Sequence, residues 1–156
     1  MNNNILDDPK RQQIYDAIPH RPPFLFIDEI KELTNDHIIC IYQFKEDEFF
    51  FQGHYPGSPI VPGVILCESA MQAGAILLSN YFKESDSESK KIPVVGRMND
   101  IKFKQLVRPG DTIQLEVELR EKMKNAYFLN AKIITNDKQL IVRFEFVCTI
   151  TERPAI

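Results

Sequence analysis

The stretch Val64–Phe82, V-I-L-C-E-S-A-M-Q-A-G-A-I-L-L-S-N-Y-F, constrains the fold more than any other part of the chain. Its length predicts a helix of ~19 residues, about 28 Å long, with apolar side chains on nearly every side. Polar residues interrupt the run at Glu68, Ser69, Gln72 and Asn80, so it falls short of the ~20 predominantly apolar residues of a membrane span. We therefore expect a buried helix, covered by a sheet that curls around it, and no membrane span.

The rest of the chain predicts an antiparallel sheet. In Thr112–Glu121, apolar residues at alternate positions from Ile113 to Leu119 give the strand one core face. The other expected elements are a helix at Pro9–Ala17, a hairpin of Phe24–Leu33 and His37–Phe44, a solvated loop at Lys83–Lys91, an extended segment at Ile92–Val107, a turn at Arg108–Asp111, and strands at Tyr127–Thr135 and Leu140–Ile150. This order predicts an α+β fold, in which something other than the sheet must cover the rest of the helix, a second copy of the chain being one candidate.

Size and charge favour one globular domain. At 156 residues the chain is expected to form a single domain over 1–156, with residues 1–8 as a flexible tail. The net charge of −3 argues against a nucleic-acid partner.

Cysteine and histidine usage restricts the chemistry. Cys40, Cys67 and Cys148 are too few and too far apart for a disulfide framework, so reduced, buried thiols are expected. The first residues lack the basic and apolar regions of a secretory signal, which together with the thiols favours a cytoplasmic location. The three histidines are not clustered, so we expect no metal and no other cofactor.

A Gly/Pro-rich loop, G-H-Y-P-G-S-P-I-V-P-G, precedes the long helix. Its three prolines and three glycines exclude a helix and disfavour a central strand. His54 in this loop titrates near neutral pH when unperturbed, which makes it a candidate base. The alternative is a turn histidine bonded to the backbone.

Glu68 lies in the long helix among apolar residues. Burial would raise the pKa of its carboxyl above ~4.3, so that it holds a proton that it can donate. The alternative is a carboxylate that complements the helix dipole. Gln72 follows by four residues on the same face and either orients the carboxyl or is a simple buried amide. Cys67 is expected to be core rather than a nucleophile.

Gly63 stands where the helix begins. The free amides of that end either polarise a substrate carbonyl or belong to an ordinary helix cap. A base, a protonated carboxyl and a carbonyl-polarising helix end together suit removal of a proton alpha to a carbonyl, with departure of a beta hydroxyl.

At these residues the chain resembles the glutamate-using 3-hydroxyacyl-(acyl carrier protein) dehydratases of the hot-dog fold. Ile18–Ile30 is similar to the family's leucine-proline-histidine-arginine entry segment, Phe50–Gly63 to its G-H-F-P-x-x-P-x-x-P-G loop, and Phe103–Asp111 to its R-F-x-x-x-V-x-P-G-D strand and turn. The resemblance implies a curved antiparallel sheet wrapped around one long central helix. It also implies an enzyme of fatty-acid or related acyl-chain synthesis.

The resemblance implies a role for individual residues. His54 would move the alpha proton, Glu68 would protonate the departing hydroxyl directly or through water, and the Gly63 amide would bind the thioester carbonyl. In that family the histidine and the glutamate of one site come from two subunits, so a homodimer with shared active sites is implied, often assembled further into a trimer of dimers.

Several positions depart from the family pattern. The family's E-A-M-A-Q reads E-S-A-M-Q here, Tyr55 replaces a phenylalanine, and Val61 replaces a methionine. The acyl pocket implied by the resemblance is lined by Tyr55, Val61, Pro62, Met71 and Gln72. Glutamate at position 68, where related dehydratase-isomerases carry aspartate, favours simple dehydration.

The family's carrier protein is acidic, so a basic patch near the pocket mouth is expected. Lys102, Lys104 and Arg108 share strand parity, and Arg97 lies nearby in sequence. The alternative is a solvated strand face.

Two other functions fit a chain of this kind. A hot-dog thioesterase would hydrolyse the thioester with a water activated by Glu68. A non-catalytic hot-dog module would bind acyl chains or act as a scaffold. The presence of both His54 and Glu68 favours the dehydratase.

Overall fold

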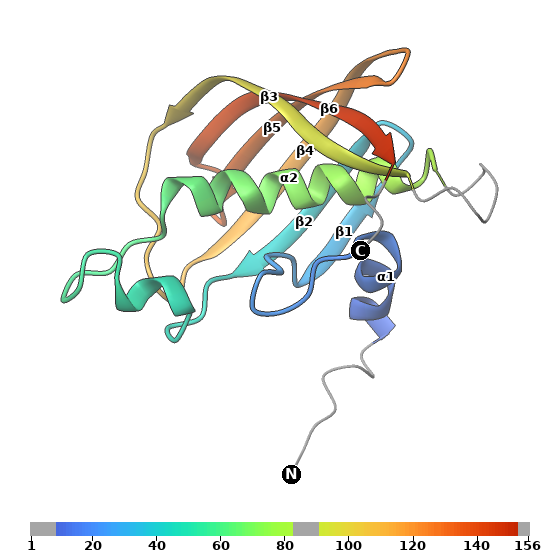
Figure 1. Ribbon diagram of the computed structural model, residues 1–156. Helices are drawn as coiled ribbons and strands as arrows, with labels where there is room; N and C mark the ends of the chain where they lie inside the picture. Colours follow the sequence, from blue (N-terminus) through green and yellow to red (C-terminus); the bar gives the residue numbers. More distant parts are fainter. Residues whose placement is uncertain (1–8, 83–90, 153–156) are drawn as a thin grey trace.

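A computed structural model describes residues 9–82 and 91–152 (Figure 1). The expected tail at residues 1–8 and nearly all of the expected loop at Lys83–Lys91 lie outside these ranges. The elements in chain order are α1 (Pro9–Ala17), β1 (Glu29–Leu33), β2 (His37–Gln43), the 3₁₀ turn η2 (Phe49–Gln52), α2 (Gly63–Ser79), β3 (Lys91–Phe103), β4 (Thr112–Met123), β5 (Ala126–Thr135) and β6 (Leu140–Glu152).

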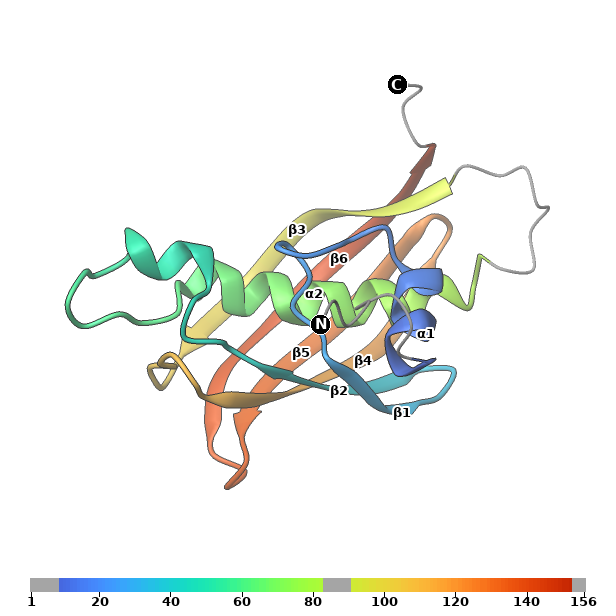
Figure 2. The same ribbon diagram turned by 90° about the horizontal axis from the view of Figure 1, so that it is seen from below.

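The strands form one six-stranded sheet in the order β1-β2-β4-β5-β6-β3, and every neighbouring pair is antiparallel. The sheet curves around α2, which lies across its concave face, while α1 lies near the C-terminal end of α2 (Figures 1 and 2). This is the hot-dog arrangement that the sequence predicted, with one long central helix.

The core lies between α2 and the inner face of the sheet. The alternation predicted for β4 is confirmed, since Ile113, Leu115 and Val117 are at most 1% exposed. Gly74 brings α2 close to the sheet, because a Cβ at this position would lie 2.7 Å from Cζ of Phe146. The ten buried residues of α2 extend from Leu66 to Leu78 and include only two polar ones, Ser69 and Gln72.

Three expected boundaries were wrong. Residues 24–28 do not form a strand, because β1 begins only at Glu29 and the Phe26 amide bonds to a side chain of α2 instead of a neighbouring strand. β3 ends at Phe103, because the next two amides, of Lys104 and Gln105, both point to the same Ile141 carbonyl of β6, at 2.7 and 3.4 Å, and the regular ladder stops there. α2 ends at Ser79, three residues before Phe82, because the last turn tightens into i to i+3 bonds.

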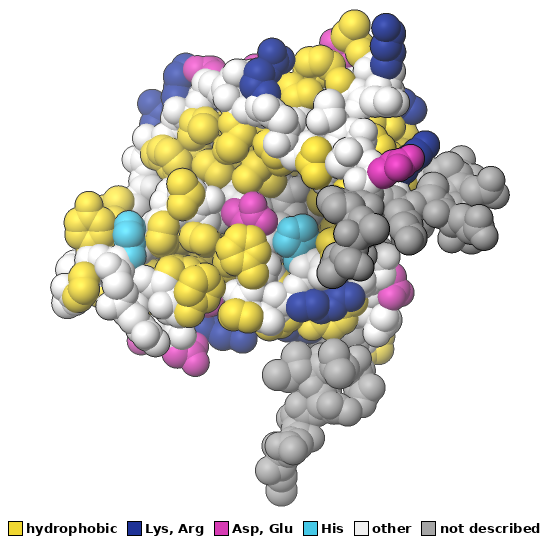
Figure 3. Space-filling model, viewed as in Figure 1, with side chains coloured by type: hydrophobic (Ala, Val, Ile, Leu, Met, Phe, Trp, Pro, Cys, Tyr) yellow, Lys and Arg dark blue, Asp and Glu magenta, His cyan; other side chains and the backbone are white. Residues whose placement is uncertain are grey.

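β3 is an edge strand with an unusual surface. It contains Pro93, which is compatible with an edge position, and apolar side chains that are exposed by 39 to 50% at Val94, Val95, Ile101 and Phe103. A broad hydrophobic area covers the face that includes α2 and β3, with histidine and acidic side chains among the apolar ones (Figure 3). No helix within residues 9–82 and 91–152 is long and apolar enough to cross a membrane.

Candidate active site

The loop between η2 and α2 fixes His54 in one orientation. The His54 amide donates to the Phe50 carbonyl at 3.0 Å, and the imidazole Nδ1 lies 2.9 Å from the Ile60 carbonyl oxygen. A carbonyl only accepts hydrogen bonds, so Nδ1 carries a proton, and in the neutral ring Nε2 has the lone pair. The turn-histidine alternative is thus correct for one ring nitrogen, while the other remains available as a base.

Backbone bonds hold this loop at its far end as well. The amide of buried Val61 donates to the Val107 carbonyl at 2.8 Å, which ties the loop to the segment between β3 and β4. Tyr55 adopts a left-handed backbone conformation, with φ of 55°, and its ring stands edge-on to His54 at 4.8 Å. The Tyr55 side chain is 63% exposed, so in the single chain it lies at the surface rather than inside a pocket.

α2 begins at Gly63, directly after the capping residue Pro62. The amides of Ile65 and Leu66 donate to the Pro62 carbonyl at 2.9 and 3.2 Å, so the two preceding amides, of Gly63 and Val64, are the ones without intrahelical acceptors. The capping residue Pro62 makes no side-chain hydrogen bond to this end. These amides are therefore donors at the helix start, as the sequence predicted.

Gly63 also has a steric reason to lack a side chain. A Cβ there would lie 2.9 Å from Cζ of Phe103, the last residue of β3. The backbone of the helix start therefore packs directly beneath an aromatic ring.

Gln72 connects the acidic residue of α2 to the entry segment before β1. Its side chain is 1% exposed, and Oε1 accepts from the Phe26 amide at 2.8 Å. This bond fixes the amide orientation, so Nε2 donates to the Phe24 carbonyl at 3.1 Å and to Oε1 of Glu68 at 3.0 Å. Both sequence alternatives hold, because Gln72 is a buried amide and it also orients the carboxyl.

Glu68 is only partly buried in the single chain. Its side chain is 22% exposed, and its second partner is His20, whose Nε2 lies 3.6 Å from Oε1. His20 was not among the predicted site residues, and its only signal in the sequence is its place in the entry segment Ile18–Ile30. Met71, the neighbour of Gln72, is partly buried and packs against the core.

The structure does not bring His54 and Glu68 together within one chain. The contacts of the His54 ring in the described ranges are with Ile60 and Tyr55, whereas those of the Glu68 carboxyl are with Gln72 and His20. A cavity of about 380 Å³ is lined by His20, the partner of Glu68, although Glu68 itself does not line it. It is bounded by the end of α1 and the segment after it, the C-terminal half of α2 with Phe82, and the start of β3.

The basic residues expected to form a patch do not share one strand. Only Arg97 and Lys102 lie in β3, so the parity argument fails for Lys104 and Arg108, which follow the end of that strand. Lys102 forms an ion pair with Asp100 at 2.9 Å. The four basic residues therefore do not lie together on one face of a strand.

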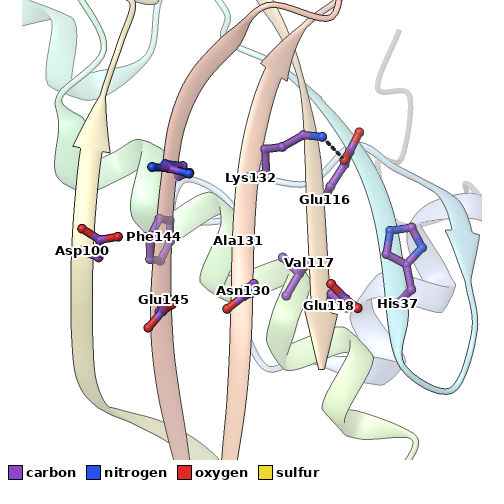
Figure 4. A pocket seen from close by; sticks show the side chains of 11 residues that line it. His37, Asp100, Glu116, Val117, Glu118, Asn130, Ala131, Lys132, Phe144 and Glu145 are labelled. Atoms are coloured by element: carbon purple, nitrogen blue, oxygen red, sulfur yellow. Dashed lines mark ion pairs between the residues drawn. The ribbon is translucent and has the colours of Figure 1, made fainter. Parts of the chain in front are cut away.

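A second hollow, of about 320 Å³, lies on the outer face of the sheet, away from α2. Its side chains are mostly charged, and Figure 4 shows Lys132 paired with Glu116 across β5 and β4, at 2.9 Å. Ladders of opposite charges are typical of a solvated sheet face. The Gly/Pro loop and Glu68 are not part of it.

The remaining reactive side chains do not offer a second mechanism. The cysteines are free and buried as predicted, and burial raises the pKa of Cys67 to about 11. No group of three or more potential metal ligands occurs within the ranges that the structure describes.

The comparisons with known proteins agree with this geometry. The FabA-like domain matches residues 18–145, which include the entry segment, the His54 loop and Glu68. The chain belongs to the FabA-like family. Its relatives in that family include the 3-hydroxyacyl-[acyl-carrier-protein] dehydratase FabZ of Syntrophobacter fumaroxidans, 36% identical over 138 residues, 88% of this chain and 91% of that protein.

A second relative is the FabZ dehydratase of Pediococcus pentosaceus, 37% identical over 129 residues, 82% of this chain and 84% of that protein. Among solved structures, the dehydratase heterocomplex ApeI:P from Xenorhabdus doucetiae has a TM-score of 0.75 at 13% identity, and the match covers 90% of this chain and 91% of that one. At that identity the likeness shows the fold alone. The resemblance to the dehydratases is confirmed by the sequence relatives.

Proposed function

We propose that this FabA-like protein is a 3-hydroxyacyl-(acyl carrier protein) dehydratase that converts (3R)-hydroxyacyl thioesters to trans-2-enoyl thioesters in fatty-acid or related acyl-chain synthesis. The observation that carries the proposal is the pair formed by a histidine with a free Nε2 and a carboxyl oriented by a buried amide. The FabZ relatives bear this activity in their names and match over most of the chain.

The chemistry follows from the atoms that the structure leaves available. His54 Nε2 takes the alpha proton while the Gly63 and Val64 amides stabilise the negative charge that develops on the thioester oxygen. Glu68 donates a proton to the beta hydroxyl, the carbon–oxygen bond breaks, a carbon–carbon double bond forms, and water leaves. Tyr55, Val61, Pro62 and Met71 are proposed to contact the acyl thioester.

The proposed catalytic unit is a homodimer in which His54 of one chain faces Glu68 of the other. The separation of the two residues in the single chain supports it, as does the apolar edge strand β3. An exposed, apolar edge is suited to pairing with another strand, and burial of its side chains is favourable at about 25 cal/mol per Å². A trimer of dimers remains part of the proposal.

The proposed substrate carrier is the acidic acyl carrier protein. Arg97, Lys102, Lys104 and Arg108 are the basic residues proposed to attract it, by charge complementarity. A cytoplasmic setting, in which the three cysteines stay reduced, belongs to the same proposal.

The activity is tested with a purified 3-hydroxyacyl thioester on acyl carrier protein, by the appearance of conjugated enoyl absorbance. The variants His54→Ala and Glu68→Gln are each expected to lose ~10²–10⁴ of the rate. Wild-type protein without turnover at any chain length would refute the dehydratase and favour the acyl-binding scaffold. Free acid as product would instead identify a thioesterase.

Mixing the two inactive variants tests the shared site. A dimer of one His54→Ala chain and one Glu68→Gln chain contains one intact site and one doubly damaged site. Random re-association makes half of the dimers mixed, so about a quarter of wild-type activity should return. Absence of recovery after verified subunit exchange would show that each site lies within one chain.

A further inference from the structure

We propose that His20 is a positioning residue for Glu68: its Nε2–H holds Oε1 of the carboxyl, so that Oε2 is the oxygen that carries and delivers the proton. This inference rests on the proposed dehydratase function. It adds a residue outside the His54 and Glu68 pair, and it assigns the transferred proton to one oxygen.

Two donors converge on the same carboxyl oxygen. Gln72 Nε2 lies 3.0 Å from Oε1 of Glu68, and His20 Nε2 lies 3.6 Å from the same atom. The second distance is longer than a hydrogen bond, so the proposal requires the two atoms to approach by a few tenths of an ångström when substrate binds, as catalytic contacts do. Both contacts of the carboxyl in the described ranges thus go to Oε1.

The environment of His20 selects its tautomer. Nδ1 is buried and has no hydrogen-bond partner among the described residues, while Nε2 faces Glu68. Burial, the largest influence, lowers the pKa of His20, the Glu68 charge opposes this shift, and Arg21 adds to it. The ring is therefore neutral near pH 7, and its single proton lies on Nε2, because Glu68 is the one acceptor that the described residues offer to this ring.

The neighbouring arginine does not replace His20 in this role. The guanidinium of Arg21 donates to the carbonyls of Tyr15, Ile18 and His20, at 2.7 to 3.1 Å, and lies over the Tyr15 ring. It is thus engaged with the backbone at the end of α1. His20 remains as the donor that the entry segment directs at the carboxyl.

This arrangement decides which oxygen reacts. An oxygen that accepts two N–H bonds is the carbonyl-type oxygen of a protonated carboxyl, so the O–H is on Oε2. During dehydration the Oε2–H bond breaks as the hydroxyl leaves as water, and the new carboxylate charge is stabilised by the donors on Oε1. Removal of His20 therefore weakens the charged form of Glu68 and leaves the carboxyl free to rotate.

The charged and titratable groups around His20 come from three elements and its own segment. They are Glu68 on α2, Arg21 beside it in the chain, and Asp16 on α1 and Lys91 on β3, which line the same cavity as His20. In the proposed dimer the partner's His54 joins them. Since only His20 is changed in the experiment below, the other groups contribute equally to every variant.

The experiment compares His20→Leu, which removes the donor, with His20→Gln, whose Nε2 reproduces a donor at similar reach. The dehydration rate is measured against pH. We expect His20→Leu to lower kcat by about 10- to 100-fold and to move the high-pH decline of the rate to higher pH, because loss of a donor disfavours the charged form of the carboxyl, which cannot donate a proton. His20→Gln should restore most of both.

His37→Leu is the matched control. His37 Nδ1 lies 3.5 Å from Oε1 of Glu32, so it is another histidine beside a glutamate, but on the outer face of the sheet. It should retain wild-type kcat and the wild-type pH profile. A ¹³C NMR titration of the Glu68 carboxyl, assigned by its absence in Glu68→Gln, measures the same shift without turnover.

Each outcome is decisive. Wild-type kcat and pH profile in His20→Leu would overturn the inference, and so would equal impairment of the Leu and Gln variants with an unchanged pH profile, which indicates a structural role. If His20→Leu does not fold, it is replaced by His20→Asn, whose side chain is too short to bring its amide donor to Glu68, and this variant is compared with His20→Gln. Inactive wild-type protein would refute the dehydratase proposal instead, and the NMR titration would still test His20.

Discussion

Replacement of Gln72 by leucine is predicted to damage both stability and chemistry. The substitution keeps a side chain of similar size but removes all three hydrogen bonds of the buried amide. The Phe26 amide is left unpaired in a residue that is 0% exposed, at a cost of about 1–3 kcal/mol. The Phe24 carbonyl belongs to a residue that is 44% exposed, so water can replace its donor and the added cost is below about 1 kcal/mol.

The sum is a loss of about 1–4 kcal/mol in the free energy of unfolding. For a chain of this size, that corresponds to a decrease in Tm of about 2–16 °C. The measurement is urea and thermal unfolding followed by circular dichroism, together with kcat for the dehydration. Because Glu68 loses its donor, kcat should fall even at temperatures at which the variant is fully folded.

The control is Gln105→Leu. Gln105 donates to Oε1 of Gln139 at 2.9 Å, but this bond is exposed, so its loss should change stability by less than about 0.5 kcal/mol. A Gln72→Leu variant as stable as Gln105→Leu would refute the reasoning. It would show that the entry segment finds other partners for its backbone.

Two further predictions concern packing and thiol reactivity. Gly74→Ala should lower stability, because the new Cβ meets the fully buried Phe146 ring, and overpacking costs about 1–3 kcal/mol against a helix-propensity gain of up to ~1 kcal/mol. Adding Phe146→Leu should reduce that penalty. If Gly74→Ala alone is more stable than wild type, the prediction is wrong. Burial raises the pKa of Cys67 and Cys148 to about 11 and that of Cys40 to about 12, so a disulfide reagent at pH 8 should label the native protein far more slowly than the urea-unfolded chain. Equal labelling rates would contradict the buried positions.

Local sequence patterns, within single helices and strands, predicted most of the fold. The alternation in β4 and the apolar run of α2 each encode a face that must be buried, and that requirement decides the element. The segment from Phe24 has the same apolar character as a strand. It was misjudged because its backbone bonds to Gln72, 46 residues away from Phe26, and no local pattern encodes such a distant partner.

For the site, too, local sequence patterns were informative and contacts between distant segments were not predicted. His54 was predicted from its Gly/Pro loop and Glu68 from its apolar surroundings, both of which are local signals. His20 was overlooked because its relation to Glu68 arises only when the entry segment crosses α2. The predicted strand parity of Lys102, Lys104 and Arg108 was wrong because the regular strand β3 ends at Phe103, and residues beyond the end of a strand do not alternate between its faces.

The three bonds of Gln72 have a consequence for protein engineering. The same amide that anchors the entry segment also holds the carboxyl oxygen of Glu68. Redesign of Phe24–Phe26 to accept a different ligand would shift that amide and, through it, the carboxyl. Changes of specificity made in this segment should therefore be selected together with compensating changes at position 72, and libraries that vary either one alone should contain few active members.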